Sequence, residues 1–249
     1  MNNIFIIGAQ RSGSTYLLSV LKDHPEISAN IKINPEPKFF LSKKIKKKDI
    51  NNYEKLYFNK TTKKTKYLCE KSTSYIEHSY ALKKIKKIYP NCKIIVILRN
   101  PALRAYSNYR FSVTNNLEKK NFIKALKSEN SRTENMHFTT SVNPFIYKKR
   151  GLYNIYLREI FDIFNELQVK ILIYEEFLEN LIEIKNLFKW LEIDSDYVPK
   201  LYQEKVNNNI NNFHNDKETI NKLFDEYKES ILDLETLIHK KIKVWHKLT

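Results

Sequence analysis

The residues that could do chemistry begin with a glycine-bounded turn near the N-terminus. A short apolar run precedes Gly8, Gly13 follows five residues later, and leucines then recur at helical spacing. This order predicts a buried strand, a tight turn and a helix that opens at the second glycine. The first amides of such a helix are unpaired and lie at the positive end of its dipole. They predict an anion site that includes the hydroxyls of Ser12, Ser14 and Thr15.

The same turn indicates which anion it would not bind. Gly8 and Gly13 have the spacing of the nucleotide triphosphatase loop G-x-x-x-x-G-K-[ST], but Ser14 stands where that loop needs its lysine. A cation occurs at Arg11 instead, and the apolar run of residues 94–98 ends in Arg99 rather than in a magnesium-binding aspartate. This pattern predicts a site for an anion that is bound without metal.

Residues 8–15 resemble the 5′-phosphosulfate loop of the sulfotransferases that use 3′-phosphoadenosine 5′-phosphosulfate (PAPS). Residues 99–109 are similar to the family's 3′-phosphate motif, in which a strand ends in Arg99 and a helix carries Ser107 eight residues later. Similarity to the heparan sulfate (carbohydrate) branch of the family and its bacterial relatives extends over residues 35–40, 70–75, 151–153 and 171–177 and to Trp245.

The resemblance implies a role for each matching residue. PAPS would be held by Arg11, Ser12, Gly13, Ser14, Thr15, Arg99 and Ser107. Sulfuryl transfer depends on alignment and on stabilising charge on the departing phosphate oxygen, which cations can do without a metal. Lys71 matches the family's catalytic lysine, and Arg11 is the second candidate cation. Glu36 matches the general base, and a carboxylate is sufficient to take the proton of an acceptor.

Each assignment has a structural alternative. Arg99 could form an ion pair at a strand end, and Glu36 could be a surface carboxylate between two prolines. Lys71 could pair with its neighbour Glu70. Most Tyr and Phe residues are expected in the core, although Tyr153 is a candidate for the wall of the donor or acceptor pocket. The joint occurrence of the motifs in the family's order favours the functional interpretation.

The sequence also departs from the branch it resembles. Arg11 replaces a lysine and would offer a planar fork instead of a point charge. Thr73 replaces a proline. The family's later loop over the nucleotide corresponds to residues 205–214, an Asn-rich stretch to which no donor contact can be assigned.

Composition limits the alternatives further. The 249 residues include 44 Lys and Arg against 28 Asp and Glu, a net charge of +16. The lysines form short runs without the signature of a nucleic-acid-binding fold, so we interpret the charge as a field that attracts an anionic donor and acceptor. No nucleic-acid partner is expected.

The compartment can also be predicted. The apolar run at residues 4–7 is too short for a signal peptide or a membrane span, which predicts a cytoplasmic chain with no membrane span. Cys69 and Cys92 lie in apolar contexts and are predicted to be buried thiols. No Cys or His cluster has zinc spacing, so no metal is expected.

Alternating strand and helix patterns must position these residues. The sequence predicts an α/β fold of one domain (residues 1–249), a P-loop-like parallel sheet with helices on both faces. The expected strands are residues 4–7, 27–33, 67–70, 93–98 and 169–174. The expected helices are residues 14–22, 49–56, 80–88, one from Pro101 that carries Ser107, 152–167 and 216–239. Residues 115–143 are weakly patterned and are expected to form an acceptor-binding loop.

The function predicted from these motifs is a PAPS-dependent sulfotransferase that acts on a hydroxyl or amine, with adenosine 3′,5′-bisphosphate as the second product. A saccharide acceptor follows from the branch resembled. Two alternatives stay open: a kinase that uses ATP with magnesium, and a basic binding module without turnover. The sequence does not predict the oligomeric state.

Overall fold

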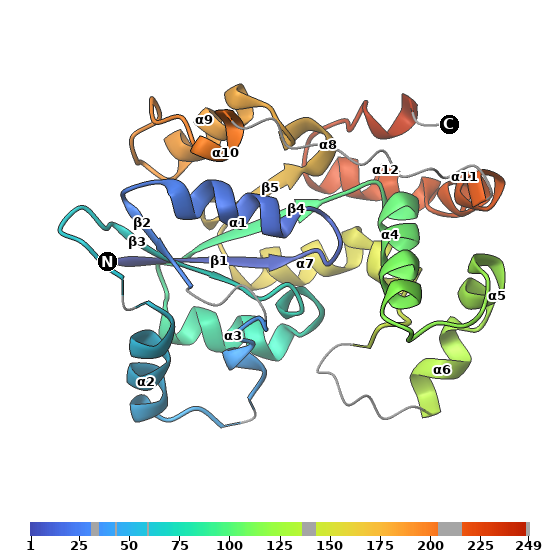
Figure 1. Ribbon diagram of the computed structural model, residues 1–249, viewed down its shortest axis with the longest axis horizontal. Coiled ribbons are helices and arrows are strands. Elements are labelled where there is room, and N and C mark those ends of the chain that lie inside the picture. The colour runs from blue at the N-terminus through green and yellow to red at the C-terminus, as the bar shows by residue number, and fades with distance from the viewer. Residues whose placement is uncertain (31–34, 43, 59, 136–142, 204–215, 248–249) are drawn as a thin grey trace.

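Five parallel strands form one sheet in the order β2-β3-β1-β4-β5 (Figure 1). The strands are β1 (Asn2–Gly8), β2 (Ile27–Ala29), β3 (Tyr67–Lys71), β4 (Lys93–Leu98) and β5 (Val169–Ile173). The computed structural model describes residues 1–30, 35–42, 44–58, 60–135, 143–203 and 216–247. The predicted α/β class and the parallel sheet are thereby confirmed.

Strand register brings the chemically interesting residues to one edge of the sheet. Ile6 of β1 lies opposite Lys71 of β3 on one side and Ile95 of β4 on the other. The pairing of β1 with β4 then becomes irregular as it approaches Gly8. Because parallel strands end at the same edge, Lys71, Gly8 and Arg99 all lie near the carboxyl ends of the three central strands, where α/β sheets bind ligands.

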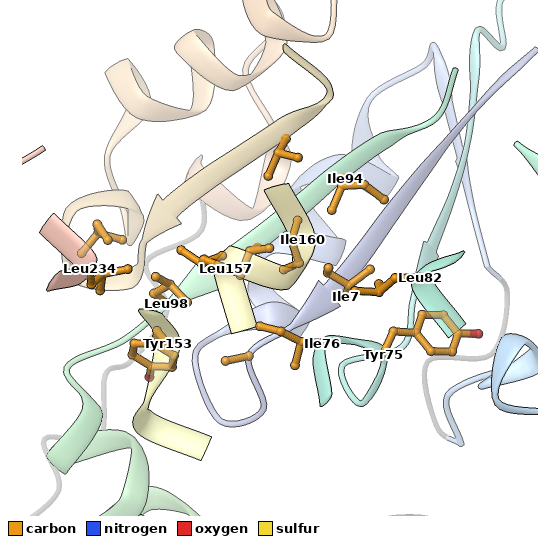
Figure 2. Close-up of a cluster of buried hydrophobic side chains, with 14 of the residues drawn as sticks. Ile7, Tyr75, Ile76, Leu82, Ile94, Leu98, Tyr153, Leu157, Ile160 and Leu234 are labelled. Atoms are coloured by element: carbon orange, nitrogen blue, oxygen red, sulfur yellow. The ribbon is translucent and has the colours of Figure 1, made fainter. Parts of the chain in front are cut away.

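Successive residues of the central strands pack on opposite faces of the sheet. Ile4 and Ile6 of β1 belong to the core on the side of α1 (Ser14–Asp23) and α9 (Leu181–Trp190). Phe5 and Ile7 belong to the core on the side of α3 (Ser79–Ile88), α7 (Tyr153–Ile163) and α12 (Lys228–Leu237). Figure 2 shows part of the second core, with side chains of the sheet meeting those of α7 and α12. Burial on both faces explains why the strands read as continuous apolar runs.

The helices divide between the two faces, with α1 on one side and α3 and α7 on the other (Figure 1). They are α1 (Ser14–Asp23), α2 (Lys47–Tyr57), α3 (Ser79–Ile88), α4 (Pro101–Thr114), α5 (Phe122–Lys127), α6 (Glu129–Asn135), α7 (Tyr153–Ile163), α8 (Tyr174–Phe177), α9 (Leu181–Trp190), α10 (Lys200–Gln203), α11 (Lys217–Glu226) and α12 (Lys228–Leu237). None of them, within the described residues, combines the length and apolar character needed to cross a membrane.

Two predicted helices differ from the structure. The single helix expected over residues 216–239 is wrong, because the chain turns at Tyr227 between α11 and α12. α11 packs on α4 and α12 packs on α7, and the Tyr227 hydroxyl donates to the carbonyl of Lys148 (2.7 Å). Tertiary packing therefore breaks a helix that has no Gly or Pro at this point. The helix expected over residues 152–167 ends at Ile163, before a short 3₁₀ turn.

The weakly patterned region after α4 is not simply a loop. It contains α5 and α6, which are too short for periodicity to reveal them. The Asn121 side chain accepts from the Lys124 amide (3.0 Å) and begins α5, and buried Phe122 packs on Tyr106 of α4. Residues 136–142 of this region, part of the strand expected over 27–33, and the Asn-rich 205–214 segment lie outside the described residues.

Candidate functional site

The turn between β1 and α1 has the geometry of an anion-binding loop. Arg11 and Gly13 both have left-handed backbone angles, with φ of 66° and 83°. A Cβ at Gly13 would lie 2.3 Å from Cδ2 of Tyr174, so both the angle and the space require glycine. α1 starts immediately afterwards with the Leu17 amide bonded to the Gly13 carbonyl (3.1 Å). The amides before Leu17 have no partner inside the helix and can receive an anion.

The three serine and threonine residues of this loop differ in exposure. Ser12 and Ser14 are buried, whereas Thr15 is exposed on the first turn of α1. All three follow Arg11, at the end of β1 where the chain reverses into α1 (Figure 1). The predicted loop residues therefore all lie in the turn or in the first turn of α1.

A pocket of about 260 Å³ lies between this loop, the end of β4 and one face of α4. It is lined by Arg11, Arg99, Leu103, Tyr106, Ser107, Arg110, Phe111 and Thr114. Three of these residues are arginines and none is acidic. The structure thus places the predicted Arg11, Arg99 and Ser107 in one cavity, and it adds Arg110, which lies one helical turn beyond Ser107.

Two of the three arginines of this pocket lie against aromatic rings. The guanidinium carbon of Arg11 lies 4.6 Å from the centre of the Phe111 ring, and that of Arg99 lies 5.1 Å from the Tyr174 ring. Burial, followed by the positive charges of Arg99 and Arg104, lowers the pKa of Arg11. The part of this shift that comes from neighbouring positive charge is one that a bound anion would relieve.

Arg99 retains capacity to bind an anion. Its Nε is buried and makes no hydrogen bond within the described residues, and no carboxylate there lies within ion-pair distance of it. The alternative interpretation of Arg99 as a strand-end ion pair is therefore not supported. One Nη atom is 3.5 Å from the carbonyl of Arg11, which joins the two cations across the turn.

The backbone around Arg99 is fixed from several sides. The buried Tyr153 hydroxyl donates to the Arg99 carbonyl (2.8 Å). The Glu175 carboxylate accepts from the Asn100 amide (2.8 Å) and from Nε1 of Trp245 (2.9 Å). The Asn100 side chain caps α4, with Pro101 in its first turn as the sequence predicts. Tyr153 lies in the core (Figure 2) and does not line the arginine pocket.

A second cluster lies at the end of the neighbouring strand β3. Nζ of Lys71 donates to Oε1 of Glu36 (2.7 Å), and both side chains are largely buried. The Thr73 amide donates to Oε2 of Glu36 (3.0 Å), and its hydroxyl donates to Oε1 (2.9 Å). Glu36 is therefore not a free surface carboxylate. A candidate base and a candidate cation are in direct contact.

The alternative pairing of Lys71 with Glu70 is wrong. Because successive residues of a strand point to opposite faces, Glu70 faces the core, where the hydroxyls of Tyr53 and Ser72 donate to it. Burial raises the pKa of Glu70 to about 7. The Ser72 hydroxyl also accepts from the Lys38 amide (2.9 Å), which fastens the segment that carries Glu36 to the end of β3.

The family model of the sulfotransferase domain matches residues 1–241. The chain belongs to the sulfotransferase family.

The relatives of this sulfotransferase agree with that assignment. It is 35% identical over 111 residues to the bifunctional heparan sulfate N-deacetylase/N-sulfotransferase 1 of Caenorhabditis briggsae, and 34% identical over 112 residues to the human enzyme 3 of the same name. Each match covers 42% of this chain, which spans only 12% of either relative. A solved sulfotransferase from Alicyclobacillus acidocaldarius has the same fold, with a TM-score of 0.80, 24% identity and 99% of both chains covered. Family membership makes this chain an enzyme that transfers sulfate.

Sequence reasoning missed several residues around the site of this sulfotransferase. Nε of Arg150 donates to Glu77 (2.7 Å), which also accepts from Nε2 of Gln10 in the loop (3.2 Å). Burial and the nearby charges of Lys71 and Arg150 lower the pKa of Lys38 beside Glu36. Arg110 could have been found by its spacing of three residues from Ser107, which places both on one helix face. The Arg150 contacts join distant segments and leave no local signal.

Proposed function

We propose that this sulfotransferase moves the sulfuryl group of PAPS to a hydroxyl or amine of a saccharide by in-line transfer. The observation that carries the proposal is the arginine pocket beside the β1–α1 loop, one strand away from the Glu36–Lys71 pair. The acceptor class is supported by the relatives, whose printed names describe heparan sulfate N-sulfotransferases. Either an amine or a hydroxyl would serve as nucleophile in the same arrangement.

The residues present suit an anion with two charged ends. The amides of the loop, with Ser12, Gly13, Ser14 and Thr15, would hold the 5′-phosphosulfate. Arg99 and Ser107 would hold the 3′-phosphate. The unpaired Nε of Arg99 and the absence of a carboxylate from the pocket lining support this division. A guanidinium suits a phosphate because it can offer two parallel N–H donors.

The chemistry follows from the position of the second cluster. Glu36 takes the proton of the acceptor hydroxyl or amine as the new bond to sulfur forms. The bond between sulfur and the bridging phosphate oxygen breaks, and its electron pair stays on that oxygen. Lys71 and Arg11 stabilise the negative charge that develops there. Adenosine 3′,5′-bisphosphate is then the leaving group and the sulfated acceptor is the product.

A thermal-shift comparison tests the donor site. A ligand at about 100 times its Kd adds about 2.7 kcal/mol to the free energy of unfolding. Adenosine 3′,5′-bisphosphate should raise Tm in the presence of EDTA. A rise with ATP that needs magnesium would indicate a kinase instead, and no rise with either nucleotide would indicate a binding module without this activity.

A substitution tests the base. Glu36→Gln keeps the size of the side chain but cannot take a proton at neutral pH. We expect turnover of PAPS with N-desulfated heparan sulfate to fall at least about 100-fold, within the range typical of a lost general base. The affinity for the bisphosphate should stay nearly intact. Unchanged turnover would remove Glu36 as the base.

A further inference from the structure

The Glu36 carboxylate is held by two different kinds of donor. Lys71 supplies its ammonium to Oε1 alone. Thr73 supplies its amide to Oε2 (3.0 Å) and a hydroxyl within reach of both oxygens (2.9 and 3.2 Å). Thr73 therefore contacts the whole carboxylate, whereas Lys71 contacts one oxygen of it.

The segment that carries Thr73 is buried and is held by backbone hydrogen bonds. Its side chain is buried, and its neighbours Ser72 and Ser74 are buried as well. The Ser72 amide donates to the carbonyl of Ile6 in β1 (3.1 Å), and the Ser72 carbonyl accepts from the Tyr75 amide (3.1 Å). Thr73 is thus attached to the central strand of the sheet, and any group that it holds is fixed relative to the β1–α1 loop.

Lys71 and Thr73 cannot both hold the Glu36 carboxylate throughout the reaction. This step rests on the proposed function, in which Lys71 stabilises charge on the leaving phosphate oxygen. An ammonium that turns toward that oxygen weakens its bond to Oε1 of Glu36. Without another donor the carboxylate would then be free to rotate away from the acceptor, and alignment would be lost.

We propose that Thr73 is a positioning residue that keeps Glu36 aimed at the acceptor when Lys71 turns to the leaving group. Its amide and hydroxyl also stabilise the ionised carboxylate, which is the form that can take a proton. A proline at this position would have neither donor.

Kinetics of Thr73 variants test the proposal. Thr73→Val keeps the shape but removes the hydroxyl, and Thr73→Ser restores it. With PAPS and N-desulfated heparan sulfate, we expect the valine variant to lose about tenfold in kcat, equivalent to about 1.4 kcal/mol, with an unchanged Kd for adenosine 3′,5′-bisphosphate. The acidic limb of its pH–kcat profile should move to higher pH, and the serine variant should restore both properties. Thr236→Val, which loses an exposed hydroxyl on α12, is the matched control.

The outcomes separate this proposal from the function on which it rests. If Glu36→Gln is inactive while Thr73→Val keeps the wild-type kcat and pH profile, the role of Thr73 is refuted and the base survives. If Glu36→Gln is fully active, the proposed base itself fails. A crystal structure of the wild type with adenosine 3′,5′-bisphosphate gives a readout that needs no acceptor. We expect Thr73 to stay bonded to Glu36 while Nζ of Lys71 moves away, and a Glu36 that leaves Thr73 would overturn the proposal.

Discussion

At the scale of single residues, Arg99 combines a fixed backbone with a guanidinium that can bind an anion. Its carbonyl and its neighbours are fixed by Tyr153 and Glu175, while its Nε stays unpaired within the described part of the chain. The backbone is held and the guanidinium is left available, which is the arrangement that binding a phosphate without rearrangement requires.

Substitution of Arg99 should therefore discriminate between nucleotides. We expect Arg99→Ala to weaken adenosine 3′,5′-bisphosphate about 10- to 100-fold, the effect of losing one or two hydrogen bonds to a charged group. Adenosine 5′-phosphosulfate lacks the 3′-phosphate and should lose less than about threefold. Calorimetric titration measures both, with Arg158→Ala as a matched control on an exposed arginine that pairs with Asp233. Equal losses for the two ligands would mean that Arg99 has only a structural role.

At the scale of elements, the β1–α1 turn is the part whose backbone decides function. Gly13→Ala would force a side chain into a left-handed angle and against Tyr174. We expect a lower Tm and at least a tenfold loss of bisphosphate affinity, since the strained angle alone costs about 1–2 kcal/mol. Lys22→Ala, on an exposed position of the same helix, should change neither. A folded Gly13→Ala protein with wild-type affinity would show that the turn does not shape the anion site.

The sequence predicted features that lie within one element better than contacts between elements. The loop, the strand before Arg99 and the helix that carries Ser107 are local patterns, so the arginine pocket could be predicted in outline. The contact of Glu36 with Lys71 joins residues 35 positions apart and was not predicted; only the roles of the two residues were, through resemblance. The break at Tyr227 was missed, because packing on α4 and α7 overrides a continuous helical pattern.

At the scale of the whole molecule, the sheet gathers positive charge at one edge and buries a carboxyl beside it. Glu70 is fully enclosed next to the hydroxyls of Tyr53 and Ser72. Burial raises its pKa from 4.5 to about 7 in the folded state. The folded protein therefore binds more protons than the unfolded chain between these two pH values, so this group makes stability fall as pH rises through that window.

The pH dependence of the free energy of unfolding tests whether burial raises the pKa of Glu70. The shift corresponds to roughly 3 kcal/mol, present below about pH 4.5 and lost by about pH 7. We expect Glu70→Gln to abolish that part of the slope in urea unfolding measured between pH 4.5 and 8. Glu166→Gln, an exposed matched control, should keep the wild-type slope. Parallel curves for the wild type and Glu70→Gln would mean that Glu70 is ionised in the folded protein over this whole pH range. The hydroxyls of Tyr53 and Ser72 would then stabilise its charge.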